Sequence, residues 1–197
     1  MVYVGRVTAE KDIQFIVDAL ERAPKNVIFG IIGAGSMVLK LKELHGEERR
    51  VHCTGDFVDR EQVALALRAA DCCVSASVME TIGFTAMEAL SCGTPCLMVN
   101  AQGFKEHLTH GTNARLWTPQ DAAAFDRELA ASMQEGRTGK WAPEALRESV
   151  AWASLDTCTD RALQAYSFAN HANTRALRLV ATLSYFALNW TLSWIIR

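Results

Sequence analysis

The sequence lacks an excess of charge of either sign. Its 20 basic residues are interspersed with 22 acidic ones, which leaves a formal net charge of −2 at pH 7. Proteins that bind nucleic acid through its phosphates usually carry a basic patch or stripe. The charge pattern therefore argues against nucleic acid as a partner.

Paired cysteine motifs are also missing. The six cysteines include no C-x-x-C pair, and most of them have apolar neighbours. This pattern predicts buried, reduced thiols in a reducing compartment, such as the cytoplasm or a plastid. His107 and His110 are spaced three residues apart, but no cysteine or carboxylate pattern accompanies them. We therefore expect neither a metal site nor a bound cofactor.

A secretory signal is absent from the first residues. MVYVGRV has no basic segment followed by an apolar core and a cleavage site, and it instead resembles a first core strand that begins without a lead-in. A chain of 197 residues is long enough for one domain with a buried core and a tail.

Short apolar runs alternate with segments of helical periodicity. Strands are expected over residues 2–7, 27–32, 51–54, 72–75, 96–99 and 114–117, and helices over about 9–22, 36–44, 59–70, 83–92, 104–108, 121–133, 143–153 and 156–168. Asp59 and Gln62 fit a capping box at one helix start, and residues 136–140 are expected to form a loop. The alternation predicts an α/β fold with a Rossmann-like, doubly wound parallel sheet covered on both faces.

Polar motifs follow four of the expected strands directly. They are Gly5-Arg6, Gly33-Ala-Gly35, Thr54-Gly55 and the run from Ser77 to Glu80. The carboxyl ends of parallel strands meet at one edge of a sheet, where such folds bind their ligands. The sequence therefore predicts a ligand site at that edge.

The stretch from Ser75 to Pro95, SASVMETIGFTAMEALSCGTP, carries two carboxylates around an expected helix start. Gly83 is expected to open this helix, and Gly93 and Pro95 to close it. Eight helical residues rise about 12 Å, so Glu80 and Glu88 could serve opposite ends of one extended ligand. Glutamate is also common on solvated helices, and the spacing by itself leaves both interpretations open.

The residue order Glu80-Thr-Ile-Gly-Phe-Thr-Ala-Met-Glu88-Ala, followed by Cys-Gly-Thr-Pro, resembles the E-x7-E signature of retaining GT-B glycosyltransferases of the family 4 type. The resemblance covers about residues 2–168. It implies the C-terminal half of a GT-B fold, which binds the nucleotide-sugar donor. The N-terminal, acceptor-binding half is missing from the sequence, so the chain is expected to be a fragment, an incomplete gene product or one of two separate chains.

The resemblance also implies roles for individual residues. Arg6 and Lys11, in the order Gly5-Arg-x-x-x-Glu-Lys, would hold the donor's diphosphate without a metal. A lysine in the first turn of a helix is unfavourable unless an anion lies nearby. Glu80 would lie near the transferred sugar, and Glu88 would accept hydrogen bonds from the ribose. The implied catalytic set is Arg6, Lys11 and Glu80.

Backbone amides would complete the donor site. Those around Thr81, Ile82, Gly83 and Phe84 are implied to face the phosphate at a helix N-terminus. The Gly33-Ala-Gly35 turn could cradle phosphate or be only a tight turn, because Val38 replaces the third glycine of the dinucleotide fingerprint. Gly55 and Val58 match a loop whose backbone faces the nucleobase. Gln102-Gly103-Phe104 departs mildly from the family's Gly-Gly-hydrophobic turn.

The C-terminal residues 169–197 form an expected hydrophobic tail. Residues 179–196, LVATLSYFALNWTLSWII, contain no charge, and their length meets the lower bound for a spanning helix. Trp190, Trp194 and Arg197 suit a membrane interface equally well. We expect a membrane-associated helix; the alternative is a helix that packs on the missing domain.

These features predict retaining hexosyl transfer from a UDP-sugar, with little or no activity in the isolated half. A membrane tail makes a lipid such as diacylglycerol a plausible acceptor, and the plant-type sulfolipid synthases are the first comparison within the family. Two alternatives remain open: a non-catalytic regulatory or assembly subunit that keeps the fold, and, because of Gly33-Ala-Gly35, a dinucleotide-dependent oxidoreductase.

Overall fold

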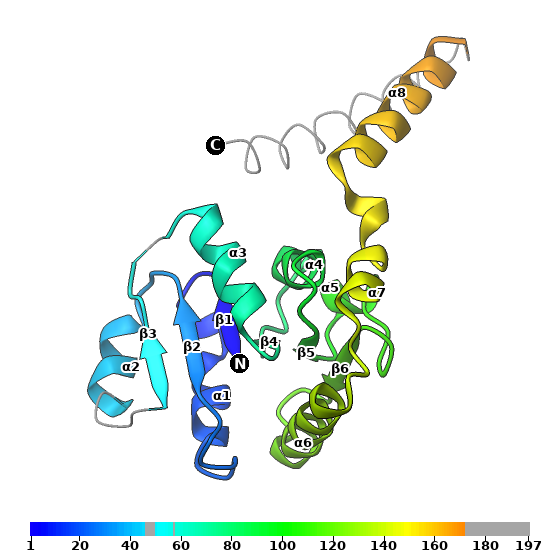
Figure 1. The fold of residues 1–197 in the computed structure, drawn as a ribbon. Coiled ribbons are helices and arrows are strands. Elements are labelled where there is room, and N and C mark those ends of the chain that lie inside the picture. The colour runs from blue at the N-terminus through cyan, green and yellow to red at the C-terminus, as the bar shows by residue number, and fades with distance from the viewer. Residues whose placement is uncertain (46–49, 57, 172–197) are drawn as a thin grey trace. The chain divides into compact units, whose positions relative to one another are not determined.

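The chain folds around one parallel sheet (Figure 1). The computed structural model describes residues 1–45, 50–56 and 58–171. Its six strands are β1 (Val2–Val4), β2 (Phe29–Ile32), β3 (Val51–Cys53), β4 (Cys73–Ser75), β5 (Cys96–Val99) and β6 (Ala114–Trp117). They are all parallel and lie in the order β3-β2-β1-β4-β5-β6. This confirms the predicted Rossmann-like α/β fold.

A helix connects each pair of consecutive strands, and three more of the described helices follow β6. In chain order these helices are α1 (Ile13–Ala19), α2 (Val38–His45), α3 (Arg60–Ala69), α4 (Phe84–Ser91), α5 (Gln102–Lys105), α6 (Ala122–Thr138), α7 (Pro143–Glu148) and α8 (Leu155–His171). Within Met1–Val150, the first of two compact units of the chain, α3 packs on α4 and α4 packs on α7, whereas α1 packs on α6. Figure 1 shows these two groups on opposite faces of the sheet.

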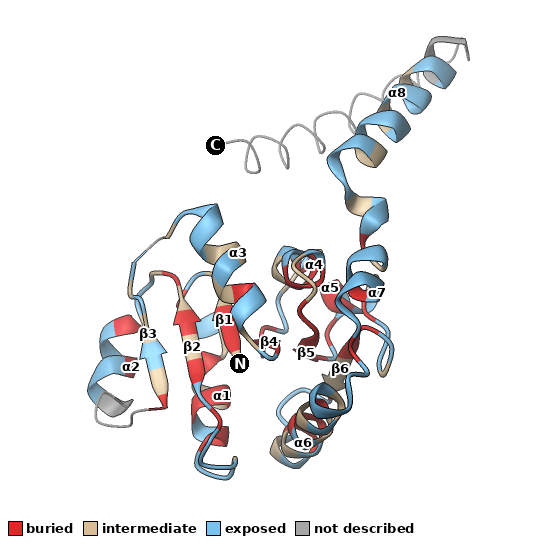
Figure 2. Ribbon diagram, viewed as in Figure 1, coloured by how far each residue is buried: buried red, intermediate tan, exposed pale blue. Residues whose placement is uncertain are grey.

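The core lies at the middle of the sheet. Every residue of β4 and β5 is buried, whereas the edge strand β3 has no buried residue, as Figure 2 shows. On one face, the ring of Trp117 packs edge-on against Phe125 of α6 with centroids 4.9 Å apart, and Phe15 of α1 stacks on Trp117. Such full burial on both faces explains why the central strands are uninterrupted apolar runs.

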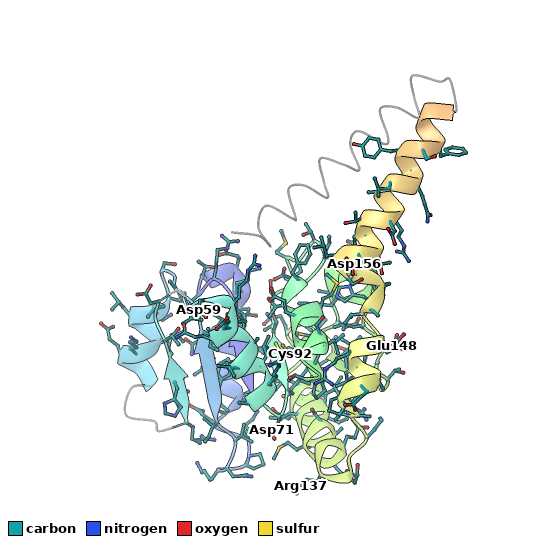
Figure 3. The ribbon with its side chains drawn as sticks, turned by 45° about the horizontal axis from the view of Figure 1, so that its top comes forward. Asp59, Asp71, Cys92, Arg137, Glu148 and Asp156 are labelled. Atoms are coloured by element: carbon teal, nitrogen blue, oxygen red, sulfur yellow. The ribbon has the colours of Figure 1, made fainter. Side chains whose placement is uncertain are left out.

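Several local signals in the sequence are confirmed. Asp59 caps α3: its side chain accepts from the Gln62 amide at 2.8 Å, and the Gln62 side chain accepts from the Asp59 amide at 3.2 Å. Figure 3 labels Asp59 at the start of this helix. Gly83 precedes α4 with φ 73°, and Gly93 follows it with φ 82°. These conformations are the ones that glycine adopts without strain.

Four predicted segments are clearly wrong in their bounds, two of them near the start of the chain. The strand expected over 2–7 ends at Val4, and the helix expected over 9–22 is divided into a 3-10 turn (Ala9–Lys11) and α1. The break is Asp12, whose φ of 48° is left-handed and whose carboxylate accepts a hydrogen bond from Gln120 Nε2 at 2.5 Å. The local sequence pattern did not predict this break, because Gln120 is 108 residues away from Asp12.

The other two errors lie near the end of the first unit. Residues 136–138, expected in a loop, are the last residues of α6, which ends at Gly139 with φ 71°. The helix expected over 143–153 is divided into α7 and a 3-10 turn (Ala151–Ala153). The first unit of the chain covers Met1–Val150, and residues from Ala151 belong to a second unit, of which the structure describes this 3-10 turn and α8. The domain bounds 1–168 and 169–197 stay a prediction.

The predicted hydrophobic helix over 179–196 lies outside the described residues. Among the helices that the structure describes, none combines the length and the apolar character needed to cross a bilayer.

Candidate functional site

The predicted ligand edge is centred on the point where the strand order reverses. β1 lies between β2 and β4, so the loops after β1 and β4 diverge to opposite sides of the sheet. In doubly wound sheets this switch point is where ligands bind. The loops after β3, β2, β1 and β4 follow one another along this edge, and three strand spacings of about 4.8 Å give a row of about 14 Å.

An ion pair crosses the switch point. Lys11 follows β1 and Glu80 follows β4, and Lys11 Nζ lies 2.5 Å from Glu80 Oε1. Their side chains are only 13% and 21% exposed. Lys11 also donates to Ser77 Oγ at 3.4 Å. The anion that the sequence required near Lys11 is therefore supplied by the chain itself.

Arg6 is far more exposed than the two residues of this pair. Its side chain is 68% exposed, and its guanidinium lies 3.6 Å from Glu10. The hydroxyl of buried Tyr3 donates to the Arg6 carbonyl at 2.8 Å, which holds the Gly5-Arg6 turn onto β1. Burial, followed by the negative charge of Glu80, raises the pKa of the Tyr3 hydroxyl, so Tyr3 remains a neutral donor.

The Gly33-Ala-Gly35 turn is explained by its packing within the sheet. A Cβ at Gly33 would lie 1.9 Å from the Gly5 carbonyl oxygen, and one at Gly35 would lie 2.2 Å from the Val7 oxygen. The Val7 amide donates to the Ala34 carbonyl at 2.9 Å, so the two loops run side by side. This close approach requires glycine at both positions, whether or not a phosphate binds there.

Gly55 and Val58 lie at the β3 end of the row. Gly55 has φ 75°, and its neighbour Thr54 accepts a hydrogen bond from the Gly33 amide at 3.1 Å. Val58 is half-buried. The loop after β3 is thereby joined to the loop after β2, and both are separated from Glu80 by β1 and its loop.

The start of α4 is anchored by contacts to two elements, β1 and α5. Thr85 Oγ1 donates to the Val4 carbonyl at 3.2 Å, which ties the first turn of α4 to the end of β1. A Cβ at Gly83 would lie 2.5 Å from the ring of buried Phe104. Gly103 approaches the loop from α5, where a Cβ would lie 2.3 Å from the Glu80 carbonyl oxygen. The loop that carries Glu80 is therefore held between β1 and α5.

The outward residues of this loop and helix are partly apolar. Phe84 is 43% exposed, Ile82 is half-buried and Thr81 is exposed, whereas Ala86 and Met87 are buried. Phe84 and Glu88 are four residues apart and so share one face of α4. The site thus combines amides and carboxylates with an apolar surface.

The carboxyl of Glu88 differs from that of an ordinary exposed glutamate in its pKa. It is an exposed residue by surface area, yet the atoms packed around it raise the pKa of its carboxyl, and the positive charge of Arg60 on α3 opposes that shift. A carboxylate whose hydration is restricted in this way gains from hydrogen-bond donors that a ligand brings.

Tyr3 is a site residue that the sequence patterns did not single out, and Ser77 was predicted only as the first residue of the polar run after a strand. Ser77 is fully buried and reaches Lys11, and Tyr3 sits in the middle of an apolar strand. The polar run did not indicate the contact between Ser77 and Lys11, because the two residues are 66 positions apart. Tyrosine among valines was the available hint, since a buried tyrosine hydroxyl needs a hydrogen-bond partner.

The described residues hold no group of three or more histidine, cysteine, aspartate or glutamate side chains that could bind a metal. All six cysteines are free: Cys72, Cys73 and Cys96 are buried, and Cys53, Cys92 and Cys158 are half-buried. Cys92 lies at the end of α4 (Figure 3). The absence of cofactor and metal stays an expectation.

Residues 1–135 match the family described as "Glycosyl transferases group 1". The chain belongs to this glycosyltransferase family. The match includes the whole row of loops from Gly5 to Gly103, so the GT-B assignment made from the E-x7-E stretch is confirmed at the level of the family and its fold.

Known relatives of this glycosyltransferase chain are longer. A GDP-mannose-dependent α-(1-6)-phosphatidylinositol dimannoside mannosyltransferase of Mycobacterium tuberculosis is 31% identical over 117 residues, which are 58% of this chain and 30% of that protein. Sucrose-phosphate synthase of Thermosynechococcus elongatus has the same fold, with a TM-score of 0.72 and 24% identity over 86% of this chain and 45% of that one. HepE of Anabaena, solved in complex with UDP, has a TM-score of 0.70 and 24% identity over 86% of this chain and 48% of its own. The chain spans 30% to 41% of the length of the curated relatives it matches.

Proposed function

We propose that the chain is the donor-binding half of a retaining GT-B glycosyltransferase of the family 4 type and that it binds a UDP-sugar. The observation that carries the proposal is the half-buried Lys11–Glu80 pair at the switch point of the sheet, with Glu88 eight residues further on. A cation and two carboxylates in this order suit a ligand that has a diphosphate between two polyhydroxylated rings.

Each part of the donor then has its own residues. Arg6 and Lys11 stabilise the negative charge that develops on the leaving diphosphate, with the amides from Thr81 to Phe84 at the start of α4 as further donors. Glu88 accepts the ribose hydroxyls, and Glu80 faces the transferred hexose. The glycine turns at 5, 33 and 35 bring backbone close to the donor, and Gly55 and Val58 lie on the side of the nucleobase.

The acceptor half has to come from elsewhere, in the same polypeptide or in a partner chain. The relatives' additional length supports this part of the proposal, because the chain covers less than half of each. The phosphatidylinositol mannosyltransferase among them acts on a membrane lipid, which favours a lipid acceptor for this chain as well. Diacylglycerol, as in the sulfolipid synthases, is one such acceptor, and association with a membrane through residues 169–197 belongs to the same proposal.

A binding titration on the isolated chain tests the donor site. Thermal unfolding is followed with UDP, GDP, ADP and NAD; a ligand at one hundred times its Kd adds about 2.7 kcal/mol to stability. UDP should stabilise the chain, and Glu88→Ala should abolish most of that effect, because it removes charge-assisted hydrogen bonds worth about 1.5–3 kcal/mol.

The matched control is Glu148→Ala, which removes an exposed carboxylate on α7 in the same unit (Figure 3). It should leave the UDP effect unchanged. Stabilisation by NAD alone would instead support the dinucleotide-dependent alternative. No stabilisation by any nucleotide, with the fold intact by circular dichroism, would contradict a donor site in the isolated chain.

A further inference from the structure

Lys11, the more buried of the two cations assigned to the site, already has a partner. Lys11 Nζ contacts Glu80 Oε1 at 2.5 Å and Ser77 Oγ at 3.4 Å. An ammonium group has three donors, so two of the three are engaged. The contact is shielded, with the two side chains 13% and 21% exposed, and screening by water and salt is therefore weaker than for a surface pair.

The pair is held from both sides by the backbone. The Gly103 backbone packs against the Glu80 carbonyl, and Thr85 fixes the following helix to β1. Lys11 is the last residue of a 3-10 turn, beside the left-handed Asp12. The loop that carries Glu80 and the turn that carries Lys11 are therefore both held in place by backbone contacts. The ion pair is already formed when a ligand arrives.

We propose that Glu80 is an internal competitor for the diphosphate: in the ligand-free chain it occupies the Lys11 ammonium that the diphosphate needs. This inference rests on the proposed function. Donor binding then has two parts, in which the diphosphate takes Lys11 and the Glu80 carboxylate is released toward the sugar. The cation is shielded until a more highly charged anion arrives.

Glu80 weakens diphosphate binding in two ways. The competing carboxylate must give up Lys11, and its negative charge also repels the incoming phosphates. Glu80→Gln removes both effects but retains the length of the side chain and an amide oxygen that can still accept from Lys11. Ser77 continues to hold the ammonium. The variant should therefore bind UDP more tightly, although it replaces a residue assigned to the site.

The opposite expectation follows if Glu80 serves mainly to orient Lys11. Its loss would then weaken the diphosphate contact. The sign of the change in UDP affinity therefore decides between a competing and a positioning carboxylate, and the size of the change is secondary.

The experiment is calorimetric titration of the full chain with UDP and with uridine. Glu80→Gln should bind UDP about tenfold more tightly than the wild type. It should bind uridine as the wild type does, since uridine carries no phosphate. Glu80→Asp keeps the charge and should show no gain. Glu148→Gln removes an exposed carboxylate on α7 and serves as a matched control for net charge.

The outcomes separate the two proposals. If UDP binds the wild type and Glu80→Gln leaves that affinity unchanged or lowers it, the competition is refuted and the donor site stands. An equal gain in Glu148→Gln would also refute it, because the effect would then be one of general charge. If neither the wild type nor folded Glu80→Gln binds UDP, the donor site itself is wrong.

Discussion

At the start of α4, Gly83 is the position where adding a methyl group should destabilise the protein most. It has φ 73°, and a Cβ there would lie 2.5 and 2.6 Å from two carbons of the Phe104 ring. The left-handed conformation costs a residue with a side chain about 1–2 kcal/mol. Overpacking a filled core costs about 1–3 kcal/mol more, and Phe104 is only 1% exposed. Gly83→Ala should therefore lower the free energy of unfolding by about 2–5 kcal/mol.

Two other glycines separate these contributions. Gly139 has φ 71° but would place its Cβ in open space, and Gly136 has a helical conformation within α6 and also meets nothing within 4 Å. Gly139→Ala should cost about 1–2 kcal/mol, from the backbone alone. Gly136→Ala should stabilise the chain by up to about 1 kcal/mol, because alanine favours a helix.

Urea unfolding of the three variants at one temperature measures these values. A second test combines Gly83→Ala with Phe104→Leu, which makes room at the ring. The double variant should be at least about 1 kcal/mol more stable than the sum of the single effects. A cost for Gly83→Ala no larger than for Gly139→Ala would refute the packing of Phe104 on the helix start.

Two further predictions concern α4 and α3. The affinity for uridine should fall on acidification, and the fall should begin at a pH above the ordinary pKa of glutamate, because the pKa of Glu88 is raised. The protonated carboxyl accepts fewer hydrogen bonds from the ribose. Glu88→Gln should remove this pH dependence in the same calorimetric titration. Asp59→Ala should cost about 1 kcal/mol in urea unfolding, since it removes the side-chain half of the capping box, whereas Asp71→Ala, another exposed aspartate, should cost far less. Equal losses for the two aspartates would contradict the cap.

Much of the fold was determined by the sequence alone, because its signals act over a few residues. The apolar runs of β5 and β6 were predicted with their observed bounds, and so were the cap at Asp59 and the glycines that bound α4. Burial on both faces demands continuous apolar strands, and helix ends demand particular caps. The E-x7-E stretch likewise indicated the family, because its residues are contiguous and their order is legible along the chain.

The tertiary structure decided which of these residues meet. The order β3-β2-β1-β4 places Lys11 beside Glu80, 69 residues away, and makes Ser77 a second partner of Lys11, a contact that no local pattern indicated. It also explains Gly33 and Gly35 by the backbone of the neighbouring loop. Contacts between loops depend on how distant strands pair, and this long-range pairing has no signature in a window of a few residues. The pairing of Lys11 with Glu80 at the switch point is therefore determined by the tertiary structure and could not be predicted from the local sequence.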